Sequence, residues 1–249
     1  MRRHPPTGQV SFWSQQQETT TPKCIFQPSS TIEVSSALLL AELFSCPFAV
    51  KSDGHAAFVG LSSIQNGLNI DLSPLNSLNL SKDLIVVSVG AGNRWVDVYP
   101  YLLQYNISVV GGRVLDIGVG GLTTGGISFF SQIYGWACDN VVNYGVVLAS
   151  GHVVNVNPNS YTDLYWALRG GGNNFGIVTR VALSKHSQGS LWSGSLIYTP
   201  DKTDLLIEAF YNYGINAVTD PKSALIFSWG YAEGTFNFTG ISALENTMT

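Results

Sequence analysis

Charged side chains are scarce in this chain of 249 residues. Asp, Glu, Lys and Arg together make 11% of the sequence, whereas about 25% is typical of soluble domains. The formal net charge is −4, and no cluster of Lys or Arg is present. Proteins that bind nucleic acid or anionic membranes need such basic clusters. The composition therefore argues against both as partners.

Long apolar runs are also missing. The longest candidate, 34–44, contains Glu42 and is far shorter than the roughly 20 residues that span a bilayer. The first six residues lack the apolar segment of a signal peptide. Three glycosylation sequons, at Asn79, Asn106 and Asn237, together with the few lysines, nevertheless favour a secreted glycoprotein, at least for a full-length parent.

Several familiar site motifs are absent. There is no phosphate-binding G-x-x-x-x-G-K-[ST], no H-E-x-x-H, no Cys/His cluster at metal spacing and no G-x-S-x-G. The segment Gly118–Gly126 fails the dinucleotide pattern G-x-G-x-x-G, because Thr123 stands where the third glycine belongs. These absences disfavour a Rossmann dehydrogenase and predict no metal site.

Only three cysteines occur. Cys24 begins a predicted strand and Cys46 follows a predicted helix, so an antiparallel pair could bring them together. We predict a Cys24–Cys46 disulfide; the alternative is two unrelated buried thiols. Cys138 is left over.

Glycine, in contrast, is abundant, with 26 residues. Dense clusters lie at 111–112, 118–126 and 170–172, and Lys51-Ser-Asp-Gly-His55 precedes them. Glycine lets a backbone approach a ligand closely, and backbone N–H groups in such loops can hold phosphate oxygens. Taken alone, His55 is a turn or surface histidine, and 118–126 is a flexible turn. Their joint pattern indicates a backbone wrapped around a large polar cofactor.

Hydrophobic periodicity predicts a mixed α+β fold. Helices are expected from the capping box Ser30–Glu33 through Phe44, and at 94–105, 163–168 and 201–213. Residues 1–21 are expected to form a loose N-terminal arm. Expected strands are 24–26, 48–51, 69–72, 84–89, 107–110, 146–149, 153–156, 175–183, 191–198 and 224–231.

The ordered motifs resemble the FAD-linked oxidoreductases of the vanillyl-alcohol oxidase superfamily, with a PCMH-type FAD-binding domain, and most closely the fungal berberine-bridge-enzyme-like members. The resemblance runs from about residue 12 to 183 and weakly on towards Trp229. It rests on Cys24-Ile-Phe-Gln-Pro-Ser, Cys46-Pro-Phe-Ala-Val-Lys-Ser-Asp-Gly-His55, Val89-Gly-Ala-Gly-x-x-Trp95, Gly111-Gly-Arg113, Gly118-Val-Gly-Gly121, Gly135-Trp-Ala-Cys-Asp-Asn-Val141 and Gly170-Gly-Gly-Asn-Asn-Phe-Gly-Ile-Val178.

This resemblance implies two small α/β subdomains that clamp FAD over 22–188, and the beginning of an incomplete substrate domain, with two strands and one helix, over 189–249. It implies that His55 is bonded to the flavin 8α-methyl group and that Ser52, Asp53 and Gly54 contact the pyrophosphate. A second pyrophosphate loop would contain Gly118, Gly120, Gly121, Thr124, Gly125 and Gly126. The residues implied to pack along the cofactor are Gly135, Cys138, Asp139, Val142, Gly176, Ile177 and Val178.

Two positions depart from the family pattern. Some members carry a second covalent link through a cysteine, and Val114 occupies that position here, so a single link is expected. Glycine is usual where Asp53 stands. A carboxylate beside a pyrophosphate is repelled by roughly 1 kcal/mol at 4 Å in water, so Asp53 is expected either to weaken FAD retention or to turn outwards.

The resemblance implies a flavin-dependent oxidase that takes a hydride from a small-molecule substrate and passes electrons to O₂. Family members continue through a larger substrate domain, which holds the usual catalytic base, so the chain looks like a truncated member and no catalytic residue is assigned. The alternatives are a non-catalytic FAD-binding fragment or pseudoenzyme, and a secreted glycine-rich binding domain without cofactor.

Overall fold

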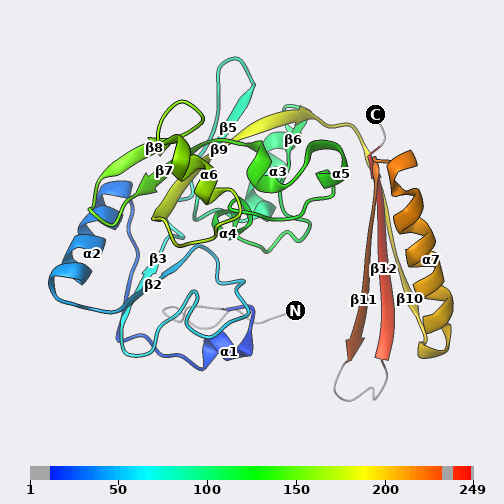
Figure 1. Cartoon of the computed structure of the whole chain (residues 1–249), viewed down its shortest axis with the longest axis horizontal. Coiled ribbons are helices and arrows are strands. Elements are labelled where there is room, and N and C mark those ends of the chain that lie inside the picture. Colours follow the sequence, from blue (N-terminus) through cyan, green and yellow to red (C-terminus); the bar gives the residue numbers. More distant parts are fainter. Residues whose placement is uncertain (1–11, 232–237, 248–249) are drawn as a thin grey trace. The chain divides into compact units, whose positions relative to one another are not determined.

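The computed structural model describes residues 12–231 and 238–247, and it divides into two compact units (Figure 1). The first unit contains residues up to Ser128 together with Trp136–His186, and the second contains Phe129–Gly135 and Ser187 onwards. The change of unit at Ser187 lies beside the domain boundary that the sequence predicts after residue 188.

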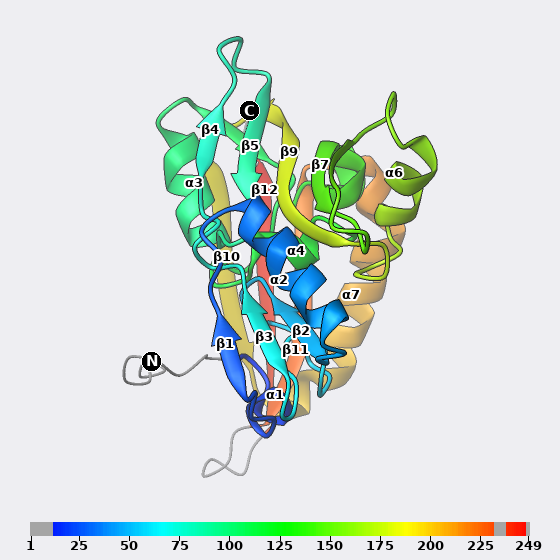
Figure 2. The ribbon, with the colours of Figure 1, turned by 90° about the vertical axis from the view of Figure 1, so that its left-hand side faces the viewer.

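The first unit contains a small sheet and a large one. The small sheet is parallel, with β3 between β1 and β2 (Figure 2). The large sheet has the order β4-β5-β9-β7-β8, and β6 also pairs with β9. The strands are β1 (Cys24–Phe26), β2 (Phe48–Lys51), β3 (Leu68–Asp71), β4 (Leu78–Leu80), β5 (Val86–Gly90), β6 (Ile107–Val109), β7 (Val141–Val147), β8 (Val153–Val156) and β9 (Ile177–Ser187).

Helices of the first unit pack against these sheets and build two apolar clusters. Trp95 and Val98 of α3 pack with Val87, Val181 and other strand residues of the large sheet. Val34 and Leu38 of α2 pack with Ile70 of β3 and with Val147 and Ile177 of the large sheet. The helices are α1 (Gln15–Glu18), α2 (Thr31–Leu43), α3 (Trp95–Leu103), α4 (Val119–Leu122), α6 (Thr162–Leu168) and the 3-10 helix Ala137–Asn140.

The beginning of α2 follows from its sequence. The Ser30 hydroxyl accepts a hydrogen bond from the Glu33 backbone N–H, as the capping box predicts. The Glu33 carboxylate accepts a hydrogen bond from the backbone N–H of Ser29, one residue earlier than in the standard box. The strands predicted at 146–149 and 153–156 are also present and form a hairpin around Ser150–Gly151, in which Val147 of β7 pairs with Val153 of β8.

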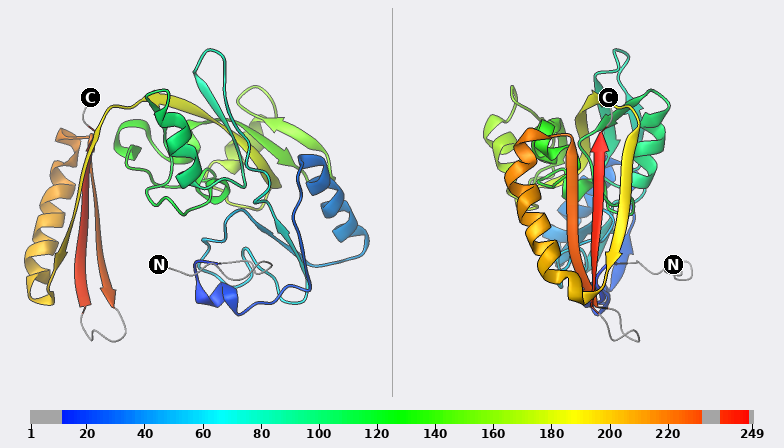
Figure 3. Two further views of the ribbon diagram at one scale, coloured as in Figure 1. Left: turned by 180° about the vertical axis from the view of Figure 1, so that it is seen from behind. Right: turned by 90° about the vertical axis from the view of Figure 1, so that its right-hand side faces the viewer.

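The second unit is a three-stranded antiparallel sheet with α7 on one face (Figure 3). Its strand order is β10-β12-β11, so β12 pairs with both neighbours. The sequence predicts only two strands here. It misses β12 because Gly240, Ala243, Glu245 and Asn246, all of types that are depleted in strands, make up four of its ten residues. The elements are α5 (Ser131–Tyr134), β10 (Leu191–Tyr198), α7 (Thr203–Asn216), β11 (Ser223–Tyr231), β12 (Phe238–Thr247) and the 3-10 helices Pro200–Lys202 and Ala217–Thr219.

The predicted Cys24–Cys46 disulfide is wrong, because all three cysteines are free in the structure. Cys24 and Phe48 both lie opposite Leu68, on the two sides of the central strand β3. Two strand spacings separate β1 from β2 by roughly 9–10 Å, and Cys46 precedes Phe48. A disulfide needs Cα atoms within about 7 Å. The sequence predicts all three strands, but not that the strand at 69–72 lies between the other two.

Residues 12–21 do not form the loose arm that the sequence predicts. Phe12 and Gln17 are buried, and the Gln17 side-chain amide donates a hydrogen bond to the Phe58 carbonyl. The rest of the expected arm, 1–11, lies outside the described residues. Within the part of the chain that the structure describes, no helix has the length and apolar character needed to cross a membrane.

Two of the predicted glycosylation sites, Asn79 and Asn106, have exposed side chains. The third, Asn237, lies outside the described residues. Glycosylation stays a prediction.

Candidate functional site

Three segments of the first unit contribute most of the lining of a cavity of about 820 Å³. One runs through β2 and the loop after it, the second includes α4, and the third leads into β9. A volume of this size is ordinary for a cofactor site. The predicted site residues that line the cavity are Ser52, Asp53, Gly54, His55, Gly118, Gly120, Gly121, Thr124, Gly176, Ile177 and Val178.

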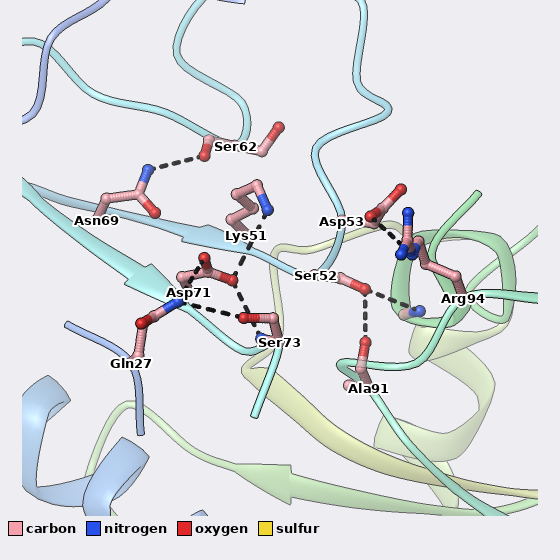
Figure 4. Close-up of polar contacts among 11 residues, drawn as sticks. Gln27, Lys51, Ser52, Asp53, Ser62, Asn69, Asp71, Ser73, Ala91 and Arg94 are labelled. Carbon is pink, nitrogen blue, oxygen red and sulfur yellow. Dashed lines mark hydrogen bonds and ion pairs between the residues drawn. The ribbon is translucent and has the colours of Figure 1, made fainter. Parts of the chain in front are cut away.

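Ser52 joins two of these segments. Its hydroxyl donates a hydrogen bond to the Ala91 carbonyl at 2.6 Å and accepts one from the Gly120 backbone N–H at 3.3 Å (Figure 4). The backbones meet closely at this point: a Cβ added at Gly118 would lie 2.6 Å from the Cβ of Asp53. Glycine at position 118 is therefore a steric requirement of the site.

Other glycines of the cavity wall border open space instead of a neighbouring backbone. A Cβ added at Gly121 or Gly172 would have no neighbour within 4 Å. Bare backbone at these positions forms an open cradle on the cavity wall, where N–H groups can approach phosphate oxygens without a lysine or arginine. Glycines of two of the predicted clusters, 118–121 and Gly172, thus line one space, and this arrangement fits a dinucleotide cofactor. The cluster at 111–112 lies instead against Trp95.

His55 lies on the cavity wall, stacked against Trp13. The ring centroids are 4.8 Å apart with an interplanar angle of 23°. The Trp13 backbone N–H donates a 3.1 Å hydrogen bond to the Gly54 carbonyl, and Gly54 has a φ of 90°, which favours glycine. Burial lowers the pKa of His55, and nearby Asp53 partly opposes that shift. The lowered pKa favours the neutral imidazole, and the stack on Trp13 orients the ring.

Asp53 lies beside Arg94, with its Oδ1 3.8 Å from Arg94 Nε (Figure 4). Arg94 Nη1 is also 3.7 Å from Asp116 Oδ1. Burial raises the pKa of Asp53, while the charges of Lys51 and Arg94 act in the opposite direction. The carboxylate lines the cavity with a cation at its side, so the repulsion expected from the sequence is partly compensated.

A buried ion pair supports the loop from behind. Lys51 and Asp71 occupy paired positions on β2 and β3, with Nζ 3.7 Å from Oδ1 (Figure 4). The Asp71 carboxylate also accepts hydrogen bonds from the Ser73 backbone N–H and from the Gln27 side-chain amide. These contacts fix the end of β2, from which the Ser52–His55 loop departs.

Some predicted site residues do not line the cavity. The carbonyls of Gly125 and Gly126 accept hydrogen bonds from Cys138 and Ala137. This pairing places 137–138 behind the glycine loop. Burial raises the pKa of the Cys138 thiol. The predicted residues outside the cavity lining are Gly125, Gly126, Gly135, Cys138, Asp139 and Val142.

Asp139 is part of that supporting layer. It forms an ion pair with Arg169 and accepts a hydrogen bond from the Trp136 backbone N–H at 2.9 Å. Val142 lies on β7. Gly135 falls in the second compact unit.

Sequence reasoning also misses lining residues. The cavity is also lined by Asn173, Asn174 and Phe175, which follow the third glycine cluster. They could have been predicted, because they lie inside the motif Gly170–Val178. Leu38 of α2 and Ser62 had no such signal, because neither lies in a glycine-rich segment.

Comparison with known proteins agrees with this geometry. Residues 22–157, more than half of the chain, match the family described as FAD binding domain. The chain therefore belongs to this family of FAD-binding proteins. The family match identifies FAD as the cofactor.

Two kinds of relatives share the fold. The FAD-dependent monooxygenase tpcD of Cochliobolus heterostrophus is 42% identical over 228 residues, covering 90% of this chain and 44% of that protein. The structure of 6-hydroxy-D-nicotine oxidase from Arthrobacter nicotinovorans matches with a TM-score of 0.84 at 22% identity, covering 96% of this chain and 53% of that one. A BBE-like protein of Arabidopsis thaliana gives a TM-score of 0.82 at 23% identity, covering 96% and 50%.

These matches confirm the resemblance to flavoenzymes with a PCMH-type, berberine-bridge-enzyme-like fold. The chain spans about half the length of the curated relatives it matches.

Proposed function

We propose that this chain forms the FAD-binding part of an FAD-dependent oxidoreductase that bonds the flavin through His55 and oxidises a small-molecule substrate. The carrying observation is the position of His55. It lies on the wall of a glycine-lined cavity, stacked on Trp13 and beside the Ser52–Gly54 loop. When bound, FAD supplies the redox chemistry, accepting a hydride and passing electrons on. The residues of this chain bind and orient it.

Each cavity wall has a role in this proposal. Gly54 and the glycines of 118–121 hold the pyrophosphate through backbone N–H groups, and Ser52 keeps the two loops together. His55 would hold the flavin through a bond from its ring nitrogen to the 8α-methyl carbon. That bond would replace one methyl C–H and the ring N–H, and O₂, the acceptor of the proposed oxidase, would take up the two electrons and two protons as hydrogen peroxide. Val114 is exposed and does not line the cavity, which supports a single attachment.

For the whole protein, the first proposal is an oxidase, in which O₂ takes both electrons and leaves as hydrogen peroxide. The second candidate is a monooxygenase, which the printed name of the fungal relative tpcD favours. The substrate class stays open among sugars, alcohols and secondary metabolites. Isotopic oxygen distinguishes the two reactions: a monooxygenase incorporates ¹⁸O from ¹⁸O₂ into the product, whereas an oxidase releases labelled peroxide.

The experiment for cofactor binding uses the visible spectrum of purified protein. Flavin absorption that stays with the protein pellet after acid precipitation supports covalent FAD. Flavin that moves into the supernatant contradicts the covalent link but keeps the FAD-binding proposal. A protein without flavin absorption, even after incubation with FAD, contradicts both. FAD retention without turnover would identify this chain as a non-catalytic FAD-binding fragment.

A further inference from the structure

Two neighbouring serines in the first unit have hydroxyls without hydrogen-bond partners among the described residues. Ser62 is 7% exposed and Ser63 is fully buried. A buried hydroxyl without a partner costs free energy, because it has lost water and gained nothing in return. Only Ser62 lines the cavity; Ser63 does not. The two serines thus share burial and chemistry but differ in access to the cavity.

The backbone around Ser62 is held in place from β3. The Asn69 side-chain amide donates a 2.9 Å hydrogen bond to the Ser62 carbonyl, and Asn69 is fully buried. Figure 4 shows the Ser62 hydroxyl directed away from Asn69. Because the carbonyl is fixed, the backbone and Cβ of Ser62 have a defined position at the cavity wall, and rotation about χ1 alone reorients the hydroxyl.

A second set of contacts fixes the beginning of the same loop. The Leu61 backbone N–H donates to the Phe58 carbonyl, which also accepts from the buried Gln17 side chain. Gly60 has a φ of 83°, a conformation that favours glycine. Gly60, Leu61 and Ser62 all line the cavity. The loop is therefore a built wall of the cavity, and it carries one buried, unpaired hydroxyl, that of Ser62.

We infer that the Ser62 hydroxyl donates a hydrogen bond to an oxygen or nitrogen acceptor of the FAD held in this cavity. The inference rests on the proposed function, because it takes FAD to be the ligand. The two pyrophosphate loops lie elsewhere on the wall, at 52–54 and 118–121. Ser62 supplies a polar contact on a separate, otherwise apolar stretch next to Leu61, and it pairs only when the cofactor is in place.

The test compares Ser62→Ala with the matched control Ser63→Ala. Both are made in the His55→Ala background, where FAD binding is reversible, and the dissociation constant is measured by titration of flavin fluorescence. We expect Ser62→Ala to weaken FAD binding roughly 3- to 10-fold. Ser63→Ala should leave the dissociation constant within about twofold, because its hydroxyl does not reach the cavity.

A second measurement is used if FAD binding to the His55→Ala proteins is too weak to titrate. In proteins that retain His55, the Tm of flavin-loaded protein is compared with that of flavin-free protein. Ser62→Ala should shrink this difference, and Ser63→Ala should not. Equal effects of the two substitutions, or none, would overturn the role of Ser62 while leaving the proposed function intact. Lack of FAD binding by the unsubstituted protein would overturn both.

Discussion

The two compact units differ in how much of their apolar surface each buries alone. The first unit contains both buried clusters, around α3 and around α2. In the second unit, α7 has no buried residue, and seven of the eight residues of β10 are exposed. Phe210 of α7 contacts Phe227 of β11 at a centroid distance of 6.3 Å, so the helix and sheet do touch. The first unit therefore has a hydrophobic core of its own, whereas the described part of the second unit, a sheet with one helix, buries few apolar side chains.

The difference in buried apolar surface indicates which unit can fold and bind the cofactor without contacts to another surface. Leu196, Ile197 and Trp192 on β10 and Leu205 and Tyr211 on α7 remain exposed. Exposed apolar surface of this extent is typical of an interaction site or an aggregation hazard. The cavity, in contrast, belongs entirely to the first unit. We therefore expect cofactor binding to be independent of the second unit.

The largest expected effect is that of His55→Ala. If the first unit alone attaches the flavin, this change removes all acid-stable flavin absorption, because His55 is the single proposed anchor. The measurement is the absorption spectrum of the redissolved pellet after acid precipitation. His152→Ala, at an exposed histidine on the β7–β8 turn, is the control and should keep acid-stable flavin. Flavin left in the His55→Ala pellet would rule out the assignment.

A pair of tryptophans tests the difference in packing. Trp95 is fully buried in the first unit, and Trp192 is 51% exposed in the second. Trp95→Ala should lower the free energy of unfolding by about 3–5 kcal/mol, because it removes a large buried side chain and leaves a cavity. Trp192→Ala should change it by less than about 1 kcal/mol. Urea unfolding followed by circular dichroism measures both, and similar losses would mean that the second unit buries Trp192 in solution.

The change Asp53→Gly tests whether Arg94 offsets the repulsion between the Asp53 carboxylate and the FAD pyrophosphate. Removing the carboxylate should raise FAD occupancy, but by only about twofold, because Arg94 already lies 3.8 Å from it. Arg94→Gln with Asp53 retained should lower occupancy, because the carboxylate then faces the pyrophosphate without that partner. The ratio of flavin to protein absorbance at low and high salt measures both effects, and salt should diminish them. Equal occupancy throughout would place the Asp53 carboxylate away from the cofactor.

The smallest expected effect is the pH dependence of stability. Burial lowers the pKa of His55 and of His186, both in the first unit. The unfolded chain then binds more protons than the folded one, so stability is present above the unfolded pKa of about 6.5 and falls as pH drops through the lower folded pKa. The second unit contains no histidine.

Urea midpoints of flavin-free protein between pH 5.5 and 7.5 measure this dependence. The midpoint should fall towards pH 5.5, and His55→Gln should flatten the slope. A midpoint that rises on acidification would contradict the sign. A slope unchanged by His55→Gln would assign the effect to His186 alone.

Much of the site followed from local chemistry. The glycine clusters and the loop ending at His55 can be recognised from short segments, because positive φ and close backbone approach both require glycine at particular positions. The cap at Ser30 is equally local. The disulfide failed for the opposite reason. It depends on which strand lies in the middle of the small sheet, and pairing partners leave little trace in a single segment. The strand β12 was missed because its residues have weak strand propensity.

The Trp13–His55 stack and the position of Ser62 show the same limit. Trp13 lies in a segment with no clear periodicity, and its contact with His55 crosses about forty residues of chain. Ser62 lies in a loop that has no glycine cluster. Burial of a hydroxyl without a partner becomes visible only once the surrounding walls are in place.

The central position of β9 sets an order of events during synthesis. Val87 of β5 pairs with Leu183 of β9, and a ribosome adding about 5–20 residues per second needs roughly 5–20 s to make the stretch between them. Throughout that interval one edge of β5 is unpaired, and the cavity lacks its third wall at 172–178. We therefore expect FAD to bind late, after nearly all of the first unit has been synthesised. A shortage of free FAD would then lead to folded protein without cofactor.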